Sequence, residues 1–406
     1  MGMLEMSAWS TISGGLTTLV VSVLLIATKH LHGKLSMDTS VGVHKFHTQP
    51  TPRIGGVAIM AGLLVSWALA KLLVDISMPL AQESARLLGL MLLAAVPAVT
   101  FGILEDITKR VGVRARLLAT MGSGLLAWWL TDTAIGHVGI WGVDNLLAIL
   151  PISVAFTAFA VGGVANSFNI IDGFNGLAAG ALLISLTSIG CIAYGVGDPA
   201  LALLCLTVAA VVLGFGVVNF PFGKIFLGDG GAYLLGFMVA WIAVLLPARN
   251  PSVSAWAALL ACGYPVLEVL FSIWRKYRRT GSHPGQPDKV HLHMLFYKRI
   301  SKHTFRHAQP ALQNGLSSIF AWAYALVPAT IAICWPQNTW IQMAGFLVSG
   351  ILYRLIYVRL TQFKWNVPIK LISKMTRYNM TRNVAHNVTR KMNLRQDDHD
   401  PERDVA

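Results

Sequence analysis

The sequence predicts an all-α integral membrane protein, a polytopic bundle of about eleven transmembrane helices. Only 12% of its 406 residues are charged and 55% are hydrophobic, and the mean hydropathy is +0.60. A soluble domain carries about twice that share of charge. Apolar stretches long enough to cross a bilayer, about 17 to 25 residues each, recur along the whole chain. Together these observations exclude a soluble protein of ordinary composition.

The predicted spans follow one another in order and are rich in Leu, Val, Ala and Gly. They are expected near residues 11–30, 54–74, 86–104, 115–131, 146–165, 177–196, 201–219, 232–248, 255–274, 313–334 and 339–359. None of them alternates polar and apolar residues as the strands of a membrane β-barrel do. We therefore expect helices, in which every backbone polar group is bonded within its own segment.

The distribution of basic residues predicts the orientation. If the first span runs from outside to inside, most loops containing Lys or Arg share one face, which the positive-inside rule makes cytoplasmic. These basic loops hold Lys34, Lys45 and Arg53, then Lys109, Arg110 and Arg114, then Arg275, Lys276, Arg278 and Arg279. The N-terminus is thus predicted outside and the C-terminus inside. The net charge of +14 reflects this asymmetry, so nucleic acid is not an expected partner.

Two parts of unequal size are predicted. Residues 1–360 form the polytopic membrane domain, which is surrounded by the lipid bilayer. Residues 361–406 form a cytoplasmic tail that begins basic, with "KWNVPIKLISKMTRYNMTRNVAHNVTRKMNLR", and ends in the polar "QDDHDPERDVA". The basic half is suited to the anionic inner leaflet, although a solvated tail without a function explains it equally well.

Polar residues collect in five loops, all on the predicted cytoplasmic face. The loops read "VHKFHTQPTPRIGG", "GILEDITKR", "NSFNIIDGFNGLAAG", "FPFGKIFLGDGG" and "HPGQPDKVHLH". Acidic groups at the ends of membrane helices are costly unless they pair, bind a cation or face water, so such a group is read as functional by default. Five loops from distant parts of the chain thus place polar and charged side chains on one membrane face.

These loops hold the residue types needed to bind a diphosphate with a divalent cation. Glu105, Asp106, Asp172 and Asp229 could supply the oxygen ligands that Mg²⁺ prefers, and Mn²⁺ is an alternative. Lys45, Arg53 and Lys224 could neutralise a diphosphate, as fixed cations do in phosphoryl transfer. The pattern therefore predicts a donor that is bound through its diphosphate and a metal ion.

Each motif has a plainer explanation when taken alone. Asn166 and Asn169 could cap the end of the fifth span, and Asp229 could cap the helix that follows it. Glu105 and Asp106 could be a solvated charge pair, and His291 and His293 could be loop surface; their H-x-H spacing does not suit zinc. Their joint occurrence on one face favours the functional reading.

The five loops, in this order, resemble the signatures of the polyprenyl-phosphate N-acetylhexosamine-1-phosphate transferases, also classed as glycosyltransferase family 4. "PRIGG", the acidic pair, "NSFNIIDGFNGL", "FPFGKIFLGD" and "PDKVHLH" carry the resemblance over roughly residues 40 to 300. It implies an enzyme of a bacterial inner membrane, acting at the cytoplasmic face, which transfers HexNAc-1-phosphate from a UDP-sugar to undecaprenyl phosphate and releases UMP. The product would initiate O-antigen, capsule or another envelope polysaccharide.

The resemblance also implies roles for individual residues. Asp229 and Asp106 would bind Mg²⁺, and Glu105 or Asp106 could instead orient the lipid phosphate. Phe226 would lie near the uracil, Asn169 and Asp172 would hold the nucleotide, and His291 and His293 would approach the diphosphate or sugar. "TPRIGG" is closer to the GlcNAc branch than to the MurNAc-pentapeptide branch, so UDP-GlcNAc is favoured, with UDP-QuiNAc and UDP-FucNAc close to it.

The chain departs from the family pattern at two positions. Glu105 stands where the first member of the acidic pair is usually Asp, and Asn175 stands where the "DG-x-DG" motif often has a second Asp. The first change alters reach and metal geometry, and the second removes a charge but keeps a group that could still contact uridine. A catalytically silent scaffold of this family is therefore one alternative.

Two other classes of membrane protein are alternatives to the transferase. A CDP-alcohol phosphotransferase requires DG-x-x-AR, but the chain reads "FNGLAAG" after Asp172 and Gly173. An ion-coupled transporter requires ionisable groups within its spans, and Glu268 is the one carboxylate near the middle of a predicted span. The plainer explanation of Glu268 is hydrogen bonding between helices.

Overall fold

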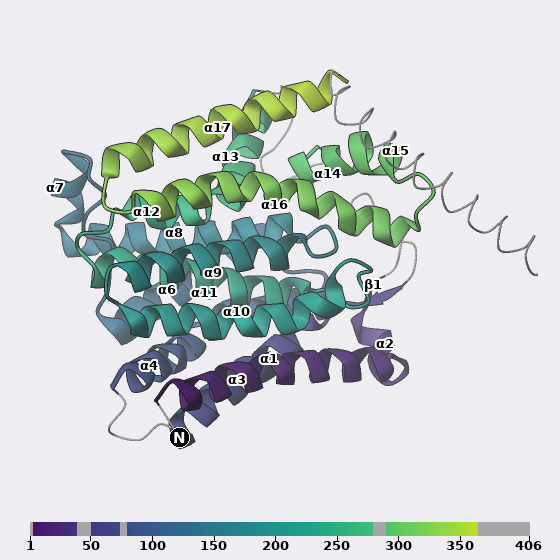
Figure 1. Cartoon of the computed structure of the whole chain (residues 1–406), viewed down its shortest axis with the longest axis horizontal. Helices are drawn as coiled ribbons and strands as arrows, with labels where there is room; N and C mark the ends of the chain where they lie inside the picture. The colour runs from purple at the N-terminus through teal and green to yellow at the C-terminus, as the bar shows by residue number, and fades with distance from the viewer. Residues whose placement is uncertain (1–2, 39–49, 74–78, 279–289, 364–406) are drawn as a thin grey trace, which may run out of the picture.

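A computed structural model describes residues 3–38, 50–73, 79–278 and 290–363 (Figure 1). Lys45 and nearly all of the tail after residue 360 lie outside these ranges. The helices of the first half are α1 (Met3–Ala27), α2 (Lys29–Ser36), α3 (Gly55–Leu73), α4 (Pro79–Ala94), α5 (Val96–Thr108), α6 (Val113–Thr131), α7 (Val143–Leu147), α8 (Leu150–Ile171) and α9 (Leu177–Gly195). Those of the second half are α10 (Pro199–Asn219), α11 (Gly228–Arg249), α12 (Ala255–Ala261), α13 (Gly263–Tyr277), α14 (Leu292–Phe296), the π-helix η1 (Tyr297–Ser301), α15 (Lys302–Thr304), α16 (Pro310–Cys334) and α17 (Thr339–Thr361).

The protein is a helical membrane bundle, as predicted. Eight of the described helices are long and apolar enough to cross a membrane, and the number rises to ten if the bent pairs α4–α5 and α12–α13 each form one span. The bends measure 49° and 85°. The expected span at 115–131 is helical in α6 but is not one of these ten, so the count of about eleven stays a prediction.

Helix α11 lies at the centre of the bundle. Of its most apolar window, 83% is buried, against 28% for the outer helices α1, α3 and α17. It packs against α3, α5, α6, α8 and α9. The outer helices instead expose large apolar side chains, such as Leu16 on α1 and Leu347 on α17, as expected where lipid replaces water.

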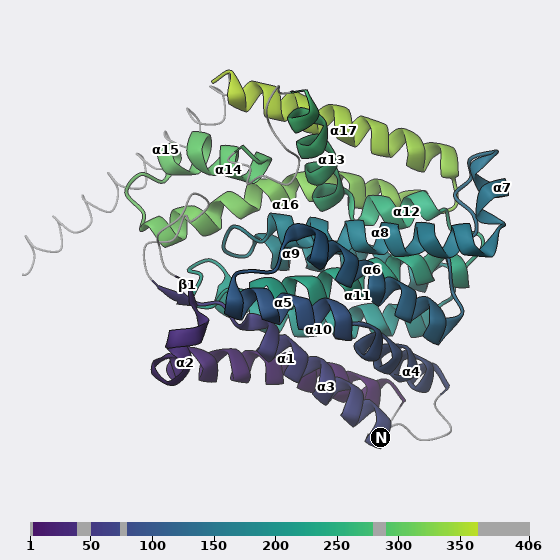
Figure 2. The same cartoon turned by 180° about the vertical axis from the view of Figure 1, so that it is seen from behind.

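The long helices run roughly side by side, and one end of the bundle gathers the short elements α2, α14 and α15 and the strand β1 (Figures 1 and 2). Strand β1 (Met37–Asp38) pairs antiparallel with β2 (Thr51–Pro52), with Met37 opposite Pro52. This two-residue pair is the only strand structure in the described ranges. It directs the chain from α2 into the start of α3.

Two of the signature loops are joined to each other by their backbones. Phe226 donates its N–H to the carbonyl of Pro52 at 2.8 Å, and the N–H groups of Gly55 and Gly56 donate to the carbonyls of Phe226 and Leu227 at 2.9 Å each. These bonds satisfy the first free amides of α3. The "PRIGG" and "GKIFLGD" loops therefore form one structural unit.

Glycines allow the helix ends to meet without intervening side chains. A Cβ on Gly56 would lie 2.5 Å from the backbone nitrogen of Gly231, and one on Gly102 would lie 2.6 Å from the Cα of Gly230. Because these neighbours are backbone atoms, they cannot rotate away. The start of α11 is thereby pressed between α3 and α5.

Gly102→Ala is expected to lower the melting temperature of the purified protein, because the added methyl would push α5 away from the start of α11. Gly122→Ala is the matched control, since Gly122 also lies inside a helix but a Cβ there would meet no atom within 4 Å. The control should be neutral or slightly stabilising, because Ala has the higher helix propensity. Equal melting temperatures for the two variants would contradict the close packing.

Candidate active site

Asp229 lies in the first turn of α11 and is only 4% exposed. Gly228, which precedes it, has a φ of +77°, a conformation that favours glycine. A side chain at Gly228 would also collide with the carbonyl of Arg53 and the carboxylate of Asp106. The "LGDGG" sequence thus allows a carboxylate to be buried at the end of a membrane helix.

Asp106, from the last turn of α5, caps α11. Its Oδ1 accepts the N–H of Asp229 at 2.9 Å, and its Oδ2 accepts the N–H of Gly230 at 2.8 Å. A carboxylate at this position satisfies free amides and complements the helix dipole. The cap of α11 is therefore Asp106, and the simpler explanation of Asp229 as that cap is wrong.

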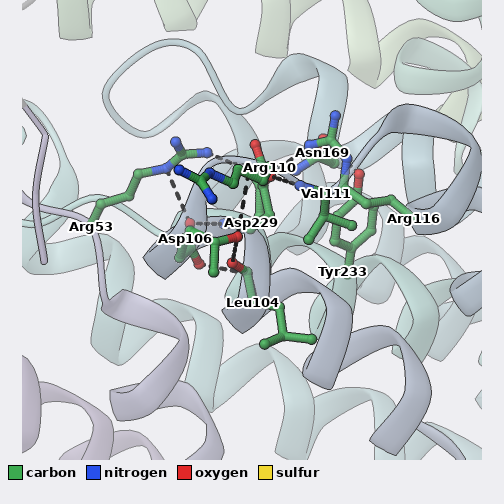
Figure 3. Close-up of polar contacts among 12 residues, drawn as sticks. Arg53, Leu104, Asp106, Arg110, Val111, Arg116, Asn169, Asp229 and Tyr233 are labelled. Carbon is green, nitrogen blue, oxygen red and sulfur yellow. Dashed lines mark hydrogen bonds and ion pairs between the residues drawn. The ribbon is translucent and has the colours of Figure 1, made fainter. Parts of the chain in front are cut away.

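Two arginines hold the Asp229 carboxylate from opposite sides (Figure 3). Arg53 forms an ion pair with Oδ1 and also approaches Asp106, with 3.4 Å between Nε and Oδ1. Arg116, from the first turns of α6, bonds Oδ2 through Nη1 at 2.7 Å. A buried carboxylate needs such partners, because leaving it unpaired would cost several kcal/mol.

Asn169 completes the contacts of Asp229. Its Nδ2 donates to Oδ1 at 3.1 Å, and its own Oδ1 accepts the hydroxyl of Tyr233 at 3.2 Å. The predicted residues Arg53, Asp106, Asn169 and Asp229 are thus brought together by the fold.

Arg116 and Tyr233 also belong to the site, although no sequence motif predicted them. Arg116 lies inside a predicted span rather than in a loop, and an arginine within an apolar segment was the available signal. Tyr233 stands four residues after Asp229, so the two side chains share one face of α11. Arg116 contacts Asp229 directly, and Tyr233 contacts it through Asn169.

Glu105 has a different role from its neighbour Asp106. Its Oε2 accepts the N–H of Val111 at 2.8 Å, which closes the turn between α5 and α6. The acidic pair is thus divided, with Asp106 at the centre and Glu105 in the turn beside it.

Asp172 follows the end of α8 and is partly buried. Burial raises the pKa of this carboxyl group to about 7; Arg53 opposes the shift, and Asp229 and Asp106 add to it. Asn166 lies farther into α8, where its Nδ2 donates to Thr120 at 2.9 Å and to the carbonyl of Gly162 at 2.7 Å.

Asn175 is buried and braces the same loop. Its Nδ2 donates to the carbonyls of Pro221 at 3.0 Å and Ala311 at 3.2 Å. Its N–H donates to Asn314 at 2.8 Å, and its carbonyl accepts Ser318 at 2.8 Å. The expectation that this amide contacts uridine therefore competes with two backbone bonds that the amide already makes.

His291 and His293 are buried rather than loop surface. His291 shares a 2.8 Å bond between Nδ1 and Glu268 Oε1, and His293 Nδ1 lies 3.1 Å from the Tyr264 hydroxyl. Burial lowers the pKa of His293 to about 3, against the attraction of Glu268, so this ring is neutral at pH 7. Its Nε2 is buried and has no hydrogen-bond partner in the described part of the chain.

Glu268 is fully buried in α13 and also accepts the N–H of Leu292. It therefore fastens the histidine loop to α13 and caps α14. The hydrogen-bonding explanation of this carboxylate is confirmed, and the observation behind the transporter alternative is accounted for.

Of the remaining predicted residues, two lie in the described part of the chain. Lys224 is exposed and Phe226 is half-buried, while Lys45 lies outside the described residues. No group of three or more His, Cys, Asp or Glu side chains in the described ranges is arranged to hold a metal ion. Mg²⁺ commonly takes one or two protein carboxylates and completes its shell with phosphate oxygens and water, so Asp229 and Asp106 fit a cation that arrives with a phosphate ligand.

Comparison with known proteins agrees with this geometry. Residues 88–247 match the family model described as "Glycosyl transferase family 4", a range that contains Asp106, Arg116, Asn169 and Asp229. The chain is 28% identical, over 296 residues, to an undecaprenyl-phosphate alpha-N-acetylglucosaminyl 1-phosphate transferase of Escherichia coli strain K12, covering 70% of this chain and 76% of that protein.

Over residues 88–247 the chain is similar to glycosyl transferase family 4. A relative with the same name in Yersinia pestis is 25% identical over 79% of this chain and 84% of its own. A decaprenyl-phosphate N-acetylglucosaminephosphotransferase of Mycolicibacterium smegmatis is 33% identical over 61% of this chain and 65% of its own. The family-model match and these relatives agree with the resemblance that the five loops indicated.

Asn175→Asp is expected to destabilise the protein, because a carboxylate cannot donate to the carbonyls of Pro221 and Ala311. Each buried carbonyl left unpaired costs about 1–3 kcal/mol. Thermal melting measures the loss. Asn338→Asp is the control, since Asn338 is an exposed helix cap that uses only its oxygen, toward Ile341. A melting temperature equal to that of this control would contradict the bracing role.

Asp172→Asn is expected to raise the melting temperature of the ligand-free protein more at pH 8 than at pH 5. Because the pKa is raised in the folded state, the contribution of Asp172 to stability is present below pH 4 and is lost as the pH rises toward 7. The neutral amide removes that loss. The same offset between variant and wild type at both pH values would contradict the shifted pKa.

Proposed function

We propose that the chain transfers N-acetylhexosamine-1-phosphate from a UDP-sugar to undecaprenyl phosphate, releases UMP, and so initiates an envelope polysaccharide such as O-antigen, capsule or exopolysaccharide. The observation that supports this most strongly is the buried Asp229, which meets Asp106, Arg53 and Arg116 at one helix end. Relatives in the same family are named for transfer of N-acetylglucosamine-1-phosphate to prenyl phosphates.

UDP-GlcNAc is the favoured donor, because the names of the relatives specify N-acetylglucosamine as the sugar. UDP-QuiNAc, UDP-FucNAc and UDP-GalNAc are the competing donors. Undecaprenyl phosphate is the proposed acceptor, held where its phosphate reaches the membrane surface.

The proposed setting is the bacterial inner membrane. About eleven spans, an N-terminus outside and a C-terminus inside would place the five signature loops on the cytoplasmic face, where UDP-sugars occur. The basic residues of these loops and of the tail at 361–406 support this orientation.

In the reaction, an oxygen of the lipid phosphate attacks the β-phosphorus of the donor. The bond from that phosphorus to the bridging oxygen breaks, and UMP leaves with the electron pair. A phosphate monoester is largely dianionic at pH 7, so the main task of the protein is to bring two anions together. Arg53 and Arg116 would neutralise the phosphates, and Lys45 and Lys224 would add further positive charge.

The remaining residues would bind the donor. Asn169 and Asp172 would hold the nucleotide, with Phe226 beside the uracil and His291 and His293 toward the sugar or diphosphate. Glu105, Asn166 and Asn175 would support the loops that present these groups. Mg²⁺, or Mn²⁺ in its place, would be held by Asp229 and Asp106 together with phosphate oxygens, and when bound would stabilise charge on the diphosphate.

The test follows UMP release by membranes containing the protein, undecaprenyl phosphate and Mg²⁺, supplied in turn with UDP-GlcNAc, UDP-GalNAc, UDP-QuiNAc and UDP-MurNAc-pentapeptide. We expect lipid-dependent release from UDP-GlcNAc and a fall of at least about 100-fold in Asp229→Asn, the effect of losing a group that positions transition-state charge. Chelation of the divalent cation with EDTA should abolish release.

Absence of UMP release from every donor by folded protein would overturn the enzymatic assignment. That result would favour the silent scaffold. Release from a donor other than UDP-GlcNAc would retain the transferase and change only its sugar.

A further inference from the structure

Both carboxylate oxygens of Asp229 are already bonded to cationic side chains. Arg53 forms an ion pair with Oδ1, which also accepts the side-chain amide of Asn169. Arg116 donates to Oδ2 at 2.7 Å. A divalent cation bound to either oxygen in this arrangement would lie beside a guanidinium ion of like charge, in a setting where only 6% of the Asp229 side chain is exposed. Repulsion at such short range, away from bulk water, is severe.

We propose, on the basis of the transferase function above, that Arg53 and Arg116 form an arginine latch on Asp229, which the diphosphate of the donor must open before a divalent cation can use that carboxylate. The latch consists of these two side chains and the Asp229 carboxylate. It makes the donor and the cation bind as a pair.

The formal charges support pairwise binding. Asp106, Asp229, Arg53 and Arg116 contact one another as two carboxylates and two guanidinium ions, so their charges cancel. A divalent cation alone would leave a charge of about +2 in this partly buried site, and a diphosphate diester alone about −2. Both together restore neutrality, which is the state that a low-dielectric environment favours.

The diphosphate offers the arginines a better partner than Asp229. Guanidinium groups bind phosphate oxygens through two parallel N–H bonds. Arg116 now uses Nη1 on Asp229, while its buried Nε has no hydrogen-bond partner among the described residues. Transfer to phosphate would use both donors of its fork, and the same movement would release Oδ2 of Asp229.

Asp106 does not take part in the exchange. Both of its oxygens accept backbone N–H groups of α11, and each keeps a further lone pair with which Asp106 could contact the cation without losing the cap. Asp106 therefore holds the helix end in place, and Asp229 is the carboxylate that changes partner.

The coupling is reciprocal, because a donor that tightens cation binding is itself bound more tightly, by the same factor, when the cation is present. It also differs from simple chelation of a cation by the donor in solution. Chelation predicts nothing about cation binding to the protein alone, whereas the latch predicts that loss of an arginine exposes Asp229 to the cation.

The test measures Mn²⁺ binding by electron paramagnetic resonance to the purified full-length protein in nanodiscs, without undecaprenyl phosphate so that the donor is not consumed. In the wild type, saturating UDP-GlcNAc should lower the Kd for Mn²⁺ by about 10-fold or more, within the usual range of coupling between sites. Arg116→Gln should bind Mn²⁺ alone about 10-fold more tightly than the wild type and lose most of the donor effect.

If Arg116→Gln does not fold, Mn²⁺ binding to Arg53→Gln tests the latch in its place. Folding of each variant is checked by thermal melting. Arg86→Gln is the matched control, because it removes the same charge from an arginine paired with a carboxylate, Glu83, in α4. Its Mn²⁺ binding should equal that of the wild type. Asp229→Asn should remove the donor-dependent binding.

The latch is overturned if both site variants bind Mn²⁺ alone no more tightly than Arg86→Gln, or if no condition gives Mn²⁺ binding. UMP release by the wild type separates this result from failure of the proposed function. Normal turnover without the coupling rejects only the latch. Tighter Mn²⁺ binding by the arginine variants, without turnover of any donor, supports the latch and rejects the transferase.

Discussion

The bond between Asp106 and the first amides of α11 is the contact on which the site depends. It joins the end of α5 to the start of the most buried helix of the bundle. Free helix-end amides inside a membrane protein are costly, and here one carboxylate satisfies two of them. Because α11 begins at this place, the side chain of Asp229 in its first turn points toward Arg53, Arg116 and Asn169.

Glycine is the second condition for this arrangement. The ends of α3, α5 and α11 approach until a single methyl group at Gly56 or Gly102 would reach the backbone of α11. Such contact is common in membrane bundles, where close packing rather than water exclusion holds helices together. In this chain it also brings Arg53, three residues before Gly56, within reach of Asp229. The glycines that allow this close packing therefore also place the guanidinium group of Arg53 beside Asp229.

A second polar network fixes the histidine loop and the loop after α8. Glu268 is buried in α13 and fastens His291 and the start of α14, while Asn175 ties the loop after α8 to the neighbourhood of α16. Buried polar groups of this kind stabilise one arrangement because each alternative leaves a group unpaired. The residues proposed to face the substrates are thus supported by residues whose hydrogen bonds are made within the protein.

The sequence by itself determined the membrane class, the order of the helices and the gathering of five polar loops, because hydropathy and charge act on each segment separately. It also predicted Arg53, Asp106, Asn169 and Asp229 as candidate site residues, which the fold brings together. Only the tertiary structure decided their roles: that Asp106 caps α11 while Glu105 closes a turn, that Arg116 reaches out of an apolar helix, and that Asn175 faces inward. These outcomes depend on which helix ends meet, and that is fixed by packing between segments distant in sequence, which no local pattern records.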